Sequence, residues 1–413
     1  MTRRNSVALS VLLLWMCSGR SLAAIQTAAS CMQADVNAAL LLANNGDTVN
    51  VPGGCSASWS SLIIPISKGI TLAGGSGGGT TTISNSGALI VNSNGTTTTR
   101  ITGFTFTSAG TTNDGDVHVI GSSSSSAYRI DHNTFTNSAQ SVFVVLEGNA
   151  PGLLDHNTFN GGAASEIIHN VALGASSNSG WTNDVVPGGS NMVFIEDNTF
   201  NCTASSFFCS GVQSYYGAQT VFRHNMLNYT QIDQHGTPGD IGARWFELYE
   251  NTFFPEGRNQ SNYFDIRAGS GLIYNNHESG ANTGAGTLSL HEEDSGTWPL
   301  AYQVGSGING QSNQHSTCSS RSGTSGVTNS NPVYVWGNDA AIKLDVSQSP
   351  SLVQLNRDFF VSSTQPAVLF RQQTASDTCA TTYSYTPYPY PHPLQGSSAI
   401  PPDPPTSAVA KPR

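Results

Sequence analysis

Charged side chains are scarce in this chain of 413 residues, since Asp, Glu, Lys and Arg together make up only 10% of it. Long stretches of Ser, Thr and Asn contain few Lys or Glu, and 43 residues are Gly. Such a composition is poor in helix formers and rich in residues of turns and strands. We therefore expect an all-β protein.

Basic residues are also few, and the formal net charge is -10. Proteins that bind nucleic acid usually present a basic face, so no nucleic-acid partner is expected. The charge does not exclude an acidic sugar polymer, because a local basic cleft can lie on an acidic body.

The chain has no long apolar run beyond its first residues, where Arg3 and Arg4 precede an apolar stretch at 7–17 and "SLA" at 21–23. That stretch is far shorter than the roughly 20 residues of a membrane span. This order of segments is typical of a signal peptide. We expect residues 1–23 to be removed on export and the protein to be secreted, to the extracellular space or the periplasm.

Cysteines are the next sparse residue type, with seven in the chain and six if Cys17 leaves with the signal peptide. In an oxidising compartment such cysteines are commonly disulfide-bonded, although sequence alone leaves their connectivity open. Proximity along the chain suggests the pairs Cys31 with Cys55, Cys202 with Cys209, and Cys318 with Cys379.

A seven-residue motif recurs through the middle of the chain, as "RIDHNTF" at 129–135 and "LLDHNTF" at 153–159. Aligning the Asn of the motif gives four further copies, "FIEDNTF", "VFRHNML", "ELYENTF" and "LIYNNHE", with the Asn at 198, 225, 251 and 276. The spacings from Asn133 onward are 24, 41, 27, 26 and 25 residues. An inserted loop at about 171–190 accounts for the long interval.

A period near 25 residues, built from short β-rich runs between Gly, Asn and Ser, is typical of a parallel β-helix with three strands in each coil. We expect Ile130 and Phe135 to point inward and Asp131 outward, because alternate residues of a strand face opposite sides. The recurrent Asn suits a tight corner, since Asn tolerates the left-handed backbone conformation. Stacked Asn amides can also hydrogen-bond from coil to coil.

Three further segments flank or interrupt this repeat. Residues 24–62 contain an amphipathic helix pattern, and we expect them to cap the N-terminal end of the β-helix, with a Cys31–Cys55 disulfide. Residues 63–392 are expected to form the β-helix, with long loops at about 171–190 and 281–330. Residues 393–413 are Pro-rich and are expected to form a disordered tail.

These features resemble the pectate-lyase-like superfamily, and the residues that carry the resemblance are "GDTVNVP", the "IDHNTF" motif and "YENTFF". The resemblance implies a right-handed, single-stranded parallel β-helix with a short N-terminal capping helix. The superfamily includes polysaccharide lyases, hydrolases, epimerases and non-catalytic adhesins, so the fold alone does not decide the function.

The resemblance to pectate lyases is closest over "FRHN" at 222–225, "DQHGTPGDIGAR" at 233–244 and "LYEN" at 248–251. Where such lyases have their first Arg, this chain has His235, and Arg244 comes later than their second. Of the ten Arg after residue 23, four lie within 45 residues, at 223, 244, 258 and 267. This Arg cluster coincides with the coils that the resemblance selects.

A lyase acting on a uronate polymer must neutralise the sugar carboxylate and remove the neighbouring proton with a base. The resemblance implies that the polymer lies on the strands preceding the repeat motif, such as "TQIDQHG" and "NYFDIRAG". We expect Arg244 and Arg267 to bind the carboxylate. His235 is expected to be the base, with Tyr215 as its rival or as the proton donor.

Further side chains near these coils are expected to contact or orient the substrate. In "NYFDIRAG", inward Phe264 and Ile266 would turn Tyr263, Asp265 and Arg267 onto one outward stripe. The complete set of secondary candidates is Arg223, Glu247, Tyr263 and Asp265. A simpler interpretation, in which Arg267 only pairs with a neighbouring carboxylate, stays open.

An acidic column precedes the recurrent Asn by two residues and consists of Asp131, Asp155 and Glu196. Stacked carboxylates repel one another unless they are screened, hydrogen-bonded or bridged by a cation. We expect them to be solvated corner residues, with a Ca²⁺ site as the alternative. The "HEED" sequence at 291–294 also suits either a cation or a solvated loop, and we favour the loop.

The sequence therefore predicts a secreted, monomeric, carbohydrate-active β-helix protein. The leading hypothesis is a polysaccharide lyase that cleaves an acidic, uronate-containing glycan by β-elimination. A non-catalytic glycan-binding or adhesin-like protein is the alternative, since few charges and many Ser, Thr and Asn fit it equally well. A glycoside hydrolase comes third, because no carboxylate pair stands out.

Overall fold

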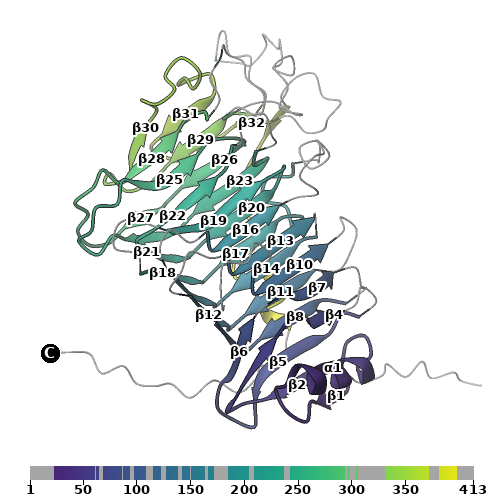
Figure 1. The fold of residues 1–413 in the computed structure, drawn as a ribbon. Coiled ribbons are helices and arrows are strands. Elements are labelled where there is room, and N and C mark those ends of the chain that lie inside the picture. The colour runs from purple at the N-terminus through teal and green to yellow at the C-terminus, as the bar shows by residue number, and fades with distance from the viewer. Residues whose placement is uncertain are drawn as a thin grey trace, which may run out of the picture.

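The computed structural model describes residues 23–60, 62–64, 68–85, 87–93, 97–107, 115–121, 127–137, 142–148, 150–162, 166–171, 185–203, 209–236, 242–293, 296, 304–305, 331–371 and 381–397. Within these ranges the chain winds into coils, most of which add one parallel strand to each of three sheets (Figure 1). The predicted right-handed parallel β-helix is confirmed. The described residues contain a single α-helix, α1 (Gln33–Leu42).

Strands follow one another in chain order within each sheet. Sheet A consists of β1 (Ile25–Thr27), β2 (Thr48–Pro52), β5 (Thr71–Ser76), β8 (Thr99–Thr102), β11 (Tyr128–Asp131), β14 (Gly152–Asp155), β17 (Val193–Glu196), β20 (Gln219–Arg223), β23 (Trp245–Tyr249), β26 (Ser270–Tyr274), β29 (Val333–Trp336) and β31 (Phe359–Ser362).

Sheet B follows sheet A around each coil. It consists of β3 (Cys55–Trp59), β6 (Thr81–Asn85), β9 (Phe104–Thr107), β12 (Thr134–Asn137), β15 (Thr158–Gly161), β18 (Thr199–Cys202), β21 (Met226–Asn228), β24 (Thr252–Phe254) and β27 (His277–Glu278).

Sheet C closes each coil. It consists of β4 (Leu62–Ile64), β7 (Leu89–Ser93), β10 (Val117–Gly121), β13 (Val144–Gly148), β16 (Ile168–Val171), β19 (Cys209–Tyr215), β22 (Thr230–Gln234), β25 (Asn262–Ile266), β28 (Thr287–Leu290) and β30 (Lys343–Asp345). Strand β28 lies inside the stretch 281–330 that was expected to be a loop, because the alternating "TLSL" pairs with β25.

The interior of the β-helix is filled by side chains that stack from coil to coil. Phe106, Phe135, Phe159 and Phe200 form a continuous pile with ring centroids 4.9 to 5.1 Å apart. Three of these rings come from the recurrent motif, and all four are fully buried. Burying one such ring stabilises the fold by about 1.5–3 kcal/mol relative to leaving it exposed.

The recurrent Asn forms the predicted ladder, from Asn133 through 157, 198, 225, 251 and 276 to Asn338. Each side-chain amide donates to the Oδ1 of the next Asn at 2.8 to 3.1 Å. The left-handed backbone conformation is adopted by the preceding residue, such as His132 (φ 54°) or Glu250 (φ 55°), and not by the Asn as expected. The Asn133 amide stabilises that corner by donating to the Asp131 carbonyl just before it and to the Ile101 carbonyl of the preceding coil.

The N-terminal segment closes one end of the core. Helix α1 buries Val36, Ala39 and Leu40 against the first strands, and the Cys31–Cys55 disulfide joins the start of the helix to β3. The described residues include no helix whose length and hydropathy would let it span a bilayer.

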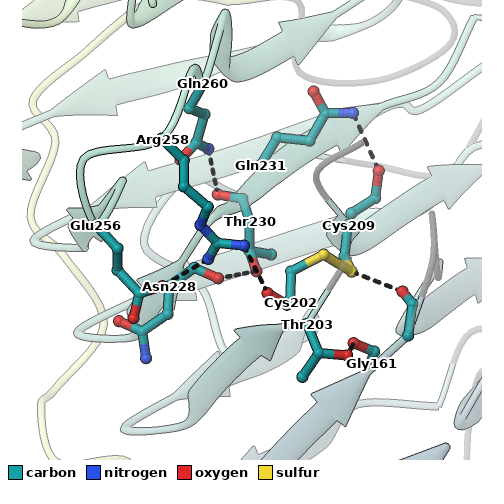
Figure 2. Close-up of a disulfide and its surroundings, with 12 residues drawn as sticks. Gly161, Cys202, Thr203, Cys209, Asn228, Thr230, Gln231, Glu256, Arg258 and Gln260 are labelled. Atoms are coloured by element: carbon teal, nitrogen blue, oxygen red, sulfur yellow. Dashed lines mark hydrogen bonds and ion pairs between the residues drawn. A yellow bond between two sulfur atoms is a disulfide. The ribbon is translucent and has the colours of Figure 1, made fainter. Parts of the chain in front are cut away.

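A second disulfide, Cys202–Cys209, links β18 to β19 beside Arg258, whose guanidinium bonds to the Cys202 carbonyl (Figure 2). Both of these pairings were predicted, and both fit an oxidising compartment. The predicted pair Cys318–Cys379 lies outside the described residues.

A C-terminal strap, which we define as residues 381–397, folds back over the outer face of sheet A. It includes β33 (Thr381–Tyr383), which pairs antiparallel with β32 (Leu369–Arg371), and the 3-10 helix η3 (Pro393–Ser397). Tyr385 of the strap packs with Trp245, Tyr274 and other outward residues of sheet A in a second apolar cluster. Residues 393–397, expected to begin a disordered tail, thus form a short helix of the strap.

Candidate functional site

The outer face of sheet C carries a stripe of ionisable side chains. One column runs from His169 through Gln213 and Asp233 to Asp265 and Ser289, which are register partners on successive coils. The position two residues after each member of this column also faces outward. We define the sheet C cluster as Glu166, His169, Gln213, Tyr215, Asp233, His235, Asp265, Arg267, His291 and Glu293.

Arg267 lies at the centre of the sheet C cluster and contacts three carboxylates. Its Nη2 is 2.6 Å from Asp233 Oδ2, its Nε is 3.6 Å from Asp265 Oδ2, and its Nη1 donates to Glu293. Burial would lower the pKa of the guanidinium, but these carboxylates raise it above its usual value. Arg267 is therefore a permanent cation surrounded by acids.

Asp233 is the most deeply buried of these acids, with 2% of its side chain exposed. Burial raises the pKa of Asp233 to about 7, even though Arg267 acts in the opposite direction. Its carboxyl group can therefore hold or release a proton near neutral pH, whereas Asp265 and Glu293 are partly open to solvent.

His235 and Tyr215 lie side by side on neighbouring coils, with ring centroids 4.5 Å apart. Burial, and then the charge of Arg267, lowers the pKa of His235 to about 4, so its imidazole is neutral at ordinary pH. Burial, followed by the charge of Glu166, raises the pKa of Tyr215, whose hydroxyl donates to Gln213. The structure thus places a neutral base beside a protonated phenol.

Six members of the sheet C cluster were not predicted as site residues, namely Glu166, His169, Gln213, Asp233, His291 and Glu293. His169 Nε2 is 2.6 Å from Glu166 Oε2, and its ring meets Tyr215 edge-on at 5.6 Å. His291 Nδ1 is 3.1 Å from Ser289 Oγ and 3.6 Å from Asp265 Oδ1. Glu293 lies 3.6 Å from His235 Nδ1. The sequence signal that could have identified them is the presence of a histidine and an acid in each of the short segments "EIIHNV" and "LSLHEE".

Two predicted substrate-binding residues lie on sheet A, away from this cluster. Arg223 is fully buried and bonds to Glu196, to the Tyr249 hydroxyl at 2.7 Å, and to the carbonyl oxygens of residues 388 and 389 in the strap. Glu247 is also fully buried on the same sheet. Both side chains fasten the strap, so the structure does not bring them to His235 and Arg267 as expected.

Two other predicted residues point away from the open face. Tyr263 is fully buried and stacks on Phe253 at 4.6 Å, because the strand register shifts between Asn262 and Phe264 and turns the ring inward. Arg244 lies directly before β23, is 0% exposed, and its backbone amide donates to the Ala218 carbonyl. Of the predicted residues, the cluster unites His235, Arg267, Tyr215 and Asp265.

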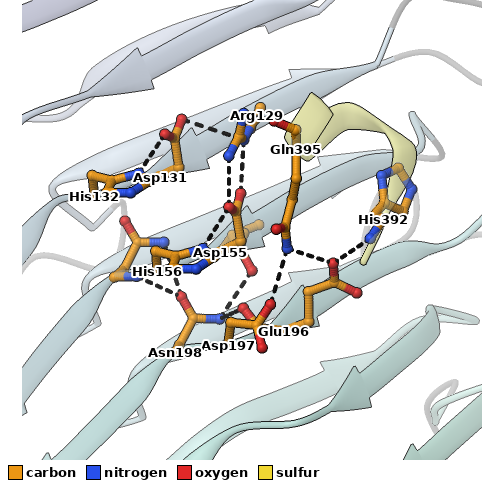
Figure 3. Close-up of polar contacts among 12 residues, drawn as sticks. Arg129, Asp131, His132, Asp155, His156, Glu196, Asp197, Asn198, His392 and Gln395 are labelled. Carbon is orange, nitrogen blue, oxygen red and sulfur yellow. Dashed lines mark hydrogen bonds and ion pairs between the residues drawn. The ribbon is translucent and has the colours of Figure 1, made fainter. Parts of the chain in front are cut away.

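The acidic column is buried and paired with arginines, which corrects the expectation of solvated corner residues (Figure 3). Arg100 and Arg129 each form two side-chain hydrogen bonds to the carboxylate of the next coil, Asp131 and Asp155 respectively. Glu196 instead pairs through Oε2 with Arg223, its register partner on the following coil. Although burial opposes it, the arginines lower the pKa of Asp131 to about 2.

These pairings also bear on the Ca²⁺ alternative. Three fully buried carboxylates that each bind a guanidinium leave too few free oxygens for a cation shell of six to eight ligands. Across the ranges that the structure describes, no group of three or more His, Cys, Asp or Glu is arranged to hold a metal ion. The described residues therefore do not fit a Ca²⁺ site.

Comparisons with known proteins give a distant likeness to a solved structure. No family model matches the chain, and no curated protein matches it. Among solved structures, the chain is similar to a PL6 family alginate lyase, with 11% sequence identity and a TM-score of 0.37, over 92% of this chain and 60% of that one. The chain thus spans less than two thirds of that lyase, and the parallel β-helix itself follows from the strand pairing described above.

Proposed function

We propose that this protein is a secreted glycan-cleaving enzyme whose active site is the sheet C cluster, and that it cleaves a uronate-containing polysaccharide by β-elimination. The observation that carries the proposal is the contact of His235 with Tyr215 beside Arg267. A neutral base, a proton donor and a cation are the three groups that such a lyase needs.

In this proposal His235 removes the proton from the sugar carbon next to the carboxylate. The glycosidic bond then breaks with its electron pair on the leaving oxygen, a carbon–carbon double bond forms, and Tyr215 donates its proton to that oxygen. Arg267 binds the substrate carboxylate, which takes the place of Glu293 on Nη1. Glu293 is suited to this exchange because 19% of its side chain is exposed.

Hydrolysis is the second candidate, and it is favoured by the carboxylates around Arg267. A glycoside hydrolase uses one protonated and one ionised carboxyl group, held apart in pKa by their surroundings. Asp233, with a pKa of about 7, would be the acid and Asp265 the base or nucleophile. The excess of acids over Arg267 would suit a neutral glycan better than an acidic one.

The two candidates are separated by measuring two products in the same incubation. The purified protein is given polygalacturonate, alginate, xylan and mannan, and new reducing ends and the ultraviolet absorbance of the unsaturated uronate are both followed. A lyase forms both products in equal amounts, whereas a hydrolase forms reducing ends alone.

Matched variants test the assignment of residues. For a lyase we expect His235→Ala and Tyr215→Phe to lower kcat/KM by about 10²–10⁴, the range for loss of a general acid or base. His277→Ala, a histidine with 48% of its side chain exposed on sheet B, serves as the control and should not change the rate. Absence of reducing ends from every polymer would contradict both enzymatic candidates and leave a glycan-binding protein.

A further inference from the structure

A cavity of about 630 Å³ lies at the corner where sheet A turns into sheet B, beneath the strap. Its lining includes Tyr249, Glu250, Tyr274, Asn275, Trp336 and Tyr390, and no residue of sheet C. The cavity is therefore separate from the sheet C cluster. Its volume lies in the range of small-molecule sites, about 300–1,000 Å³.

One wall of this corner cavity is a rigid aromatic stack. Tyr249 and Tyr274 lie 4.5 Å apart with planes 9° apart, and Tyr274 and Trp336 lie 4.4 Å apart with planes 5° apart. All three rings are at least nine-tenths buried. Tyr390 also lines the cavity; it is 47% exposed and its ring rests on that of His224 at 3.7 Å.

The polar lining of the corner cavity consists of hydrogen-bonding groups. Asn275 Nδ2 donates to Glu250 Oε1 at 3.0 Å, and both residues are partly exposed to solvent. Ser363, Thr364 and Gln365 line the mouth. Carboxylate, amide and hydroxyl groups beside aromatic rings match a sugar residue, which has apolar C–H faces and a rim of hydroxyls.

The charges in the corner cavity exclude an acidic ligand. Arg223 lines it, but its guanidinium is already bonded to Glu196 and to two strap carbonyls. Burial, and then the charge of Arg223, lowers the pKa of His224, so that imidazole is neutral. Glu250 is thus the charge that faces the ligand, with His277 3.7 Å away on its other side. A uronate would be repelled.

We propose that the corner cavity is a second carbohydrate-binding site, which takes a neutral sugar residue between Tyr390 and the aromatic stack. The inference goes beyond the proposed function, because it concerns binding on a different face and does not depend on whether the sheet C cluster cleaves a glycan.

The test uses the full-length protein carrying His235→Ala, so that cleavage cannot disturb the measurement. Cellohexaose, mannohexaose, xylohexaose and hexagalacturonate are titrated in a calorimeter. We expect at least one neutral hexasaccharide to bind, and Tyr390→Ala to weaken that binding roughly tenfold or more, as for the loss of an aromatic anchor. Tyr390→Phe, which keeps the ring, should change the Kd less than about threefold.

Two further variants keep the test decisive if Tyr390→Ala loosens the strap. Thr364→Trp fills the mouth of the cavity and should abolish binding, whereas Met226→Ala, at a 46% exposed site on sheet B, should not change it. The proposal is overturned if no neutral hexasaccharide binds at millimolar concentration, if Thr364→Trp weakens the binding of hexagalacturonate instead of that of the neutral hexasaccharides, or if Thr364→Trp binds the neutral hexasaccharides as the parent does.

Discussion

The hydroxyl of Tyr385 donates a 2.7 Å hydrogen bond to Glu247, a residue 138 positions earlier in the chain. Glu247 also accepts hydrogen bonds from the Gly188 backbone amide and the Trp245 indole. Donors from three segments thus meet at one buried carboxylate. This arrangement gives Glu247 a structural role on sheet A, where it holds the strap in place.

Removing that hydroxyl should destabilise the protein. We expect Tyr385→Phe to lower the free energy of unfolding by about 1–3 kcal/mol, because a buried carboxylate loses one of its donors. Tyr390→Phe is the matched control, since the Tyr390 hydroxyl bonds to Asp197 at an exposed site, and it should cost less than about 1 kcal/mol. Urea unfolding measures both. Equal losses would argue against the strap being anchored at Glu247.

Asn198 belongs to the buried ladder, whereas Asn201 lies on the following strand, β18, and the two can be compared. Asn198 is buried, accepts from the backbone and side-chain amides of Asn157, and donates to Asn225. Asn198→Ala leaves several buried groups unpaired, and we expect a loss of about 3 kcal/mol or more. Asn201→Ala, in a partly exposed row with Asn160 and Asn228, should lose about 1 kcal/mol at most. Chemical denaturation gives both values, and a smaller loss for Asn198 than for Asn201 would refute the buried ladder's importance.

Asp233 should make stability depend on pH with a defined sign. Its pKa is about 7 in the folded protein against an ordinary 3.8, so between these values the folded state holds a proton that the unfolded state has lost. The stabilisation that results from the raised pKa of Asp233 is fully present below pH 4 and is lost as the pH rises toward 7. We expect the stability of the parent relative to Asp233→Asn to fall by up to about 4 kcal/mol over that window.

Asp345→Asn serves as a control, because the stability that Asp345 contributes should change with pH in the opposite direction. The backbone amide of Ser347 lowers the pKa of Asp345, so its contribution is gained rather than lost as the pH rises. Urea unfolding at a series of pH values should therefore give Asp345→Asn the reverse trend. A parallel course for the parent and Asp233→Asn would show that Asp233 is not the group responsible.

The proposal that His235 is the base predicts how kcat/KM changes at acidic pH. Because the pKa of His235 is about 4, kcat/KM of the lyase should stay level down to about pH 5 and fall only below it. Initial rates of the ultraviolet product at a range of pH values measure this. A fall centred near pH 6.5, the ordinary pKa of histidine, would exclude a buried neutral His235 as the base.

The repeat was predictable from sequence because one motif carries both the inward Phe and the ladder Asn, and their physical demands recur in every coil. Asn338 was not predicted as a ladder residue because its surroundings, "VWGNDA", lack the Phe that follows most other copies of the Asn. The inward turn of Tyr263 was not predictable, since a register shift of one residue leaves no mark in the alternation of "NYFDIRAG".

The placement of the functional side chains was likewise predictable only where it depends on local sequence. Local alternation correctly grouped Asp265 with Arg267, because both lie on one short strand. The fates of Arg223 and Glu247 depended on a segment about 140 to 165 residues away, and a run of Tyr and Pro has no periodicity that reveals where it will pack. The acidic column could have been paired from sequence, since Arg100 and Arg129 stand at the equivalent outward position in their own repeats.

The strap also has a consequence for the order of assembly. Chains emerge from the ribosome N-terminus first, and coils can stack as they appear. The carbonyl groups that bind Arg129 and Arg223, and the amide that binds Glu196, belong to residues 388–395 and are made after all of those coils. Until residues 388–395 have been synthesised, those buried charges lack part of their final hydrogen bonding, so the strap completes coils that were made well before it.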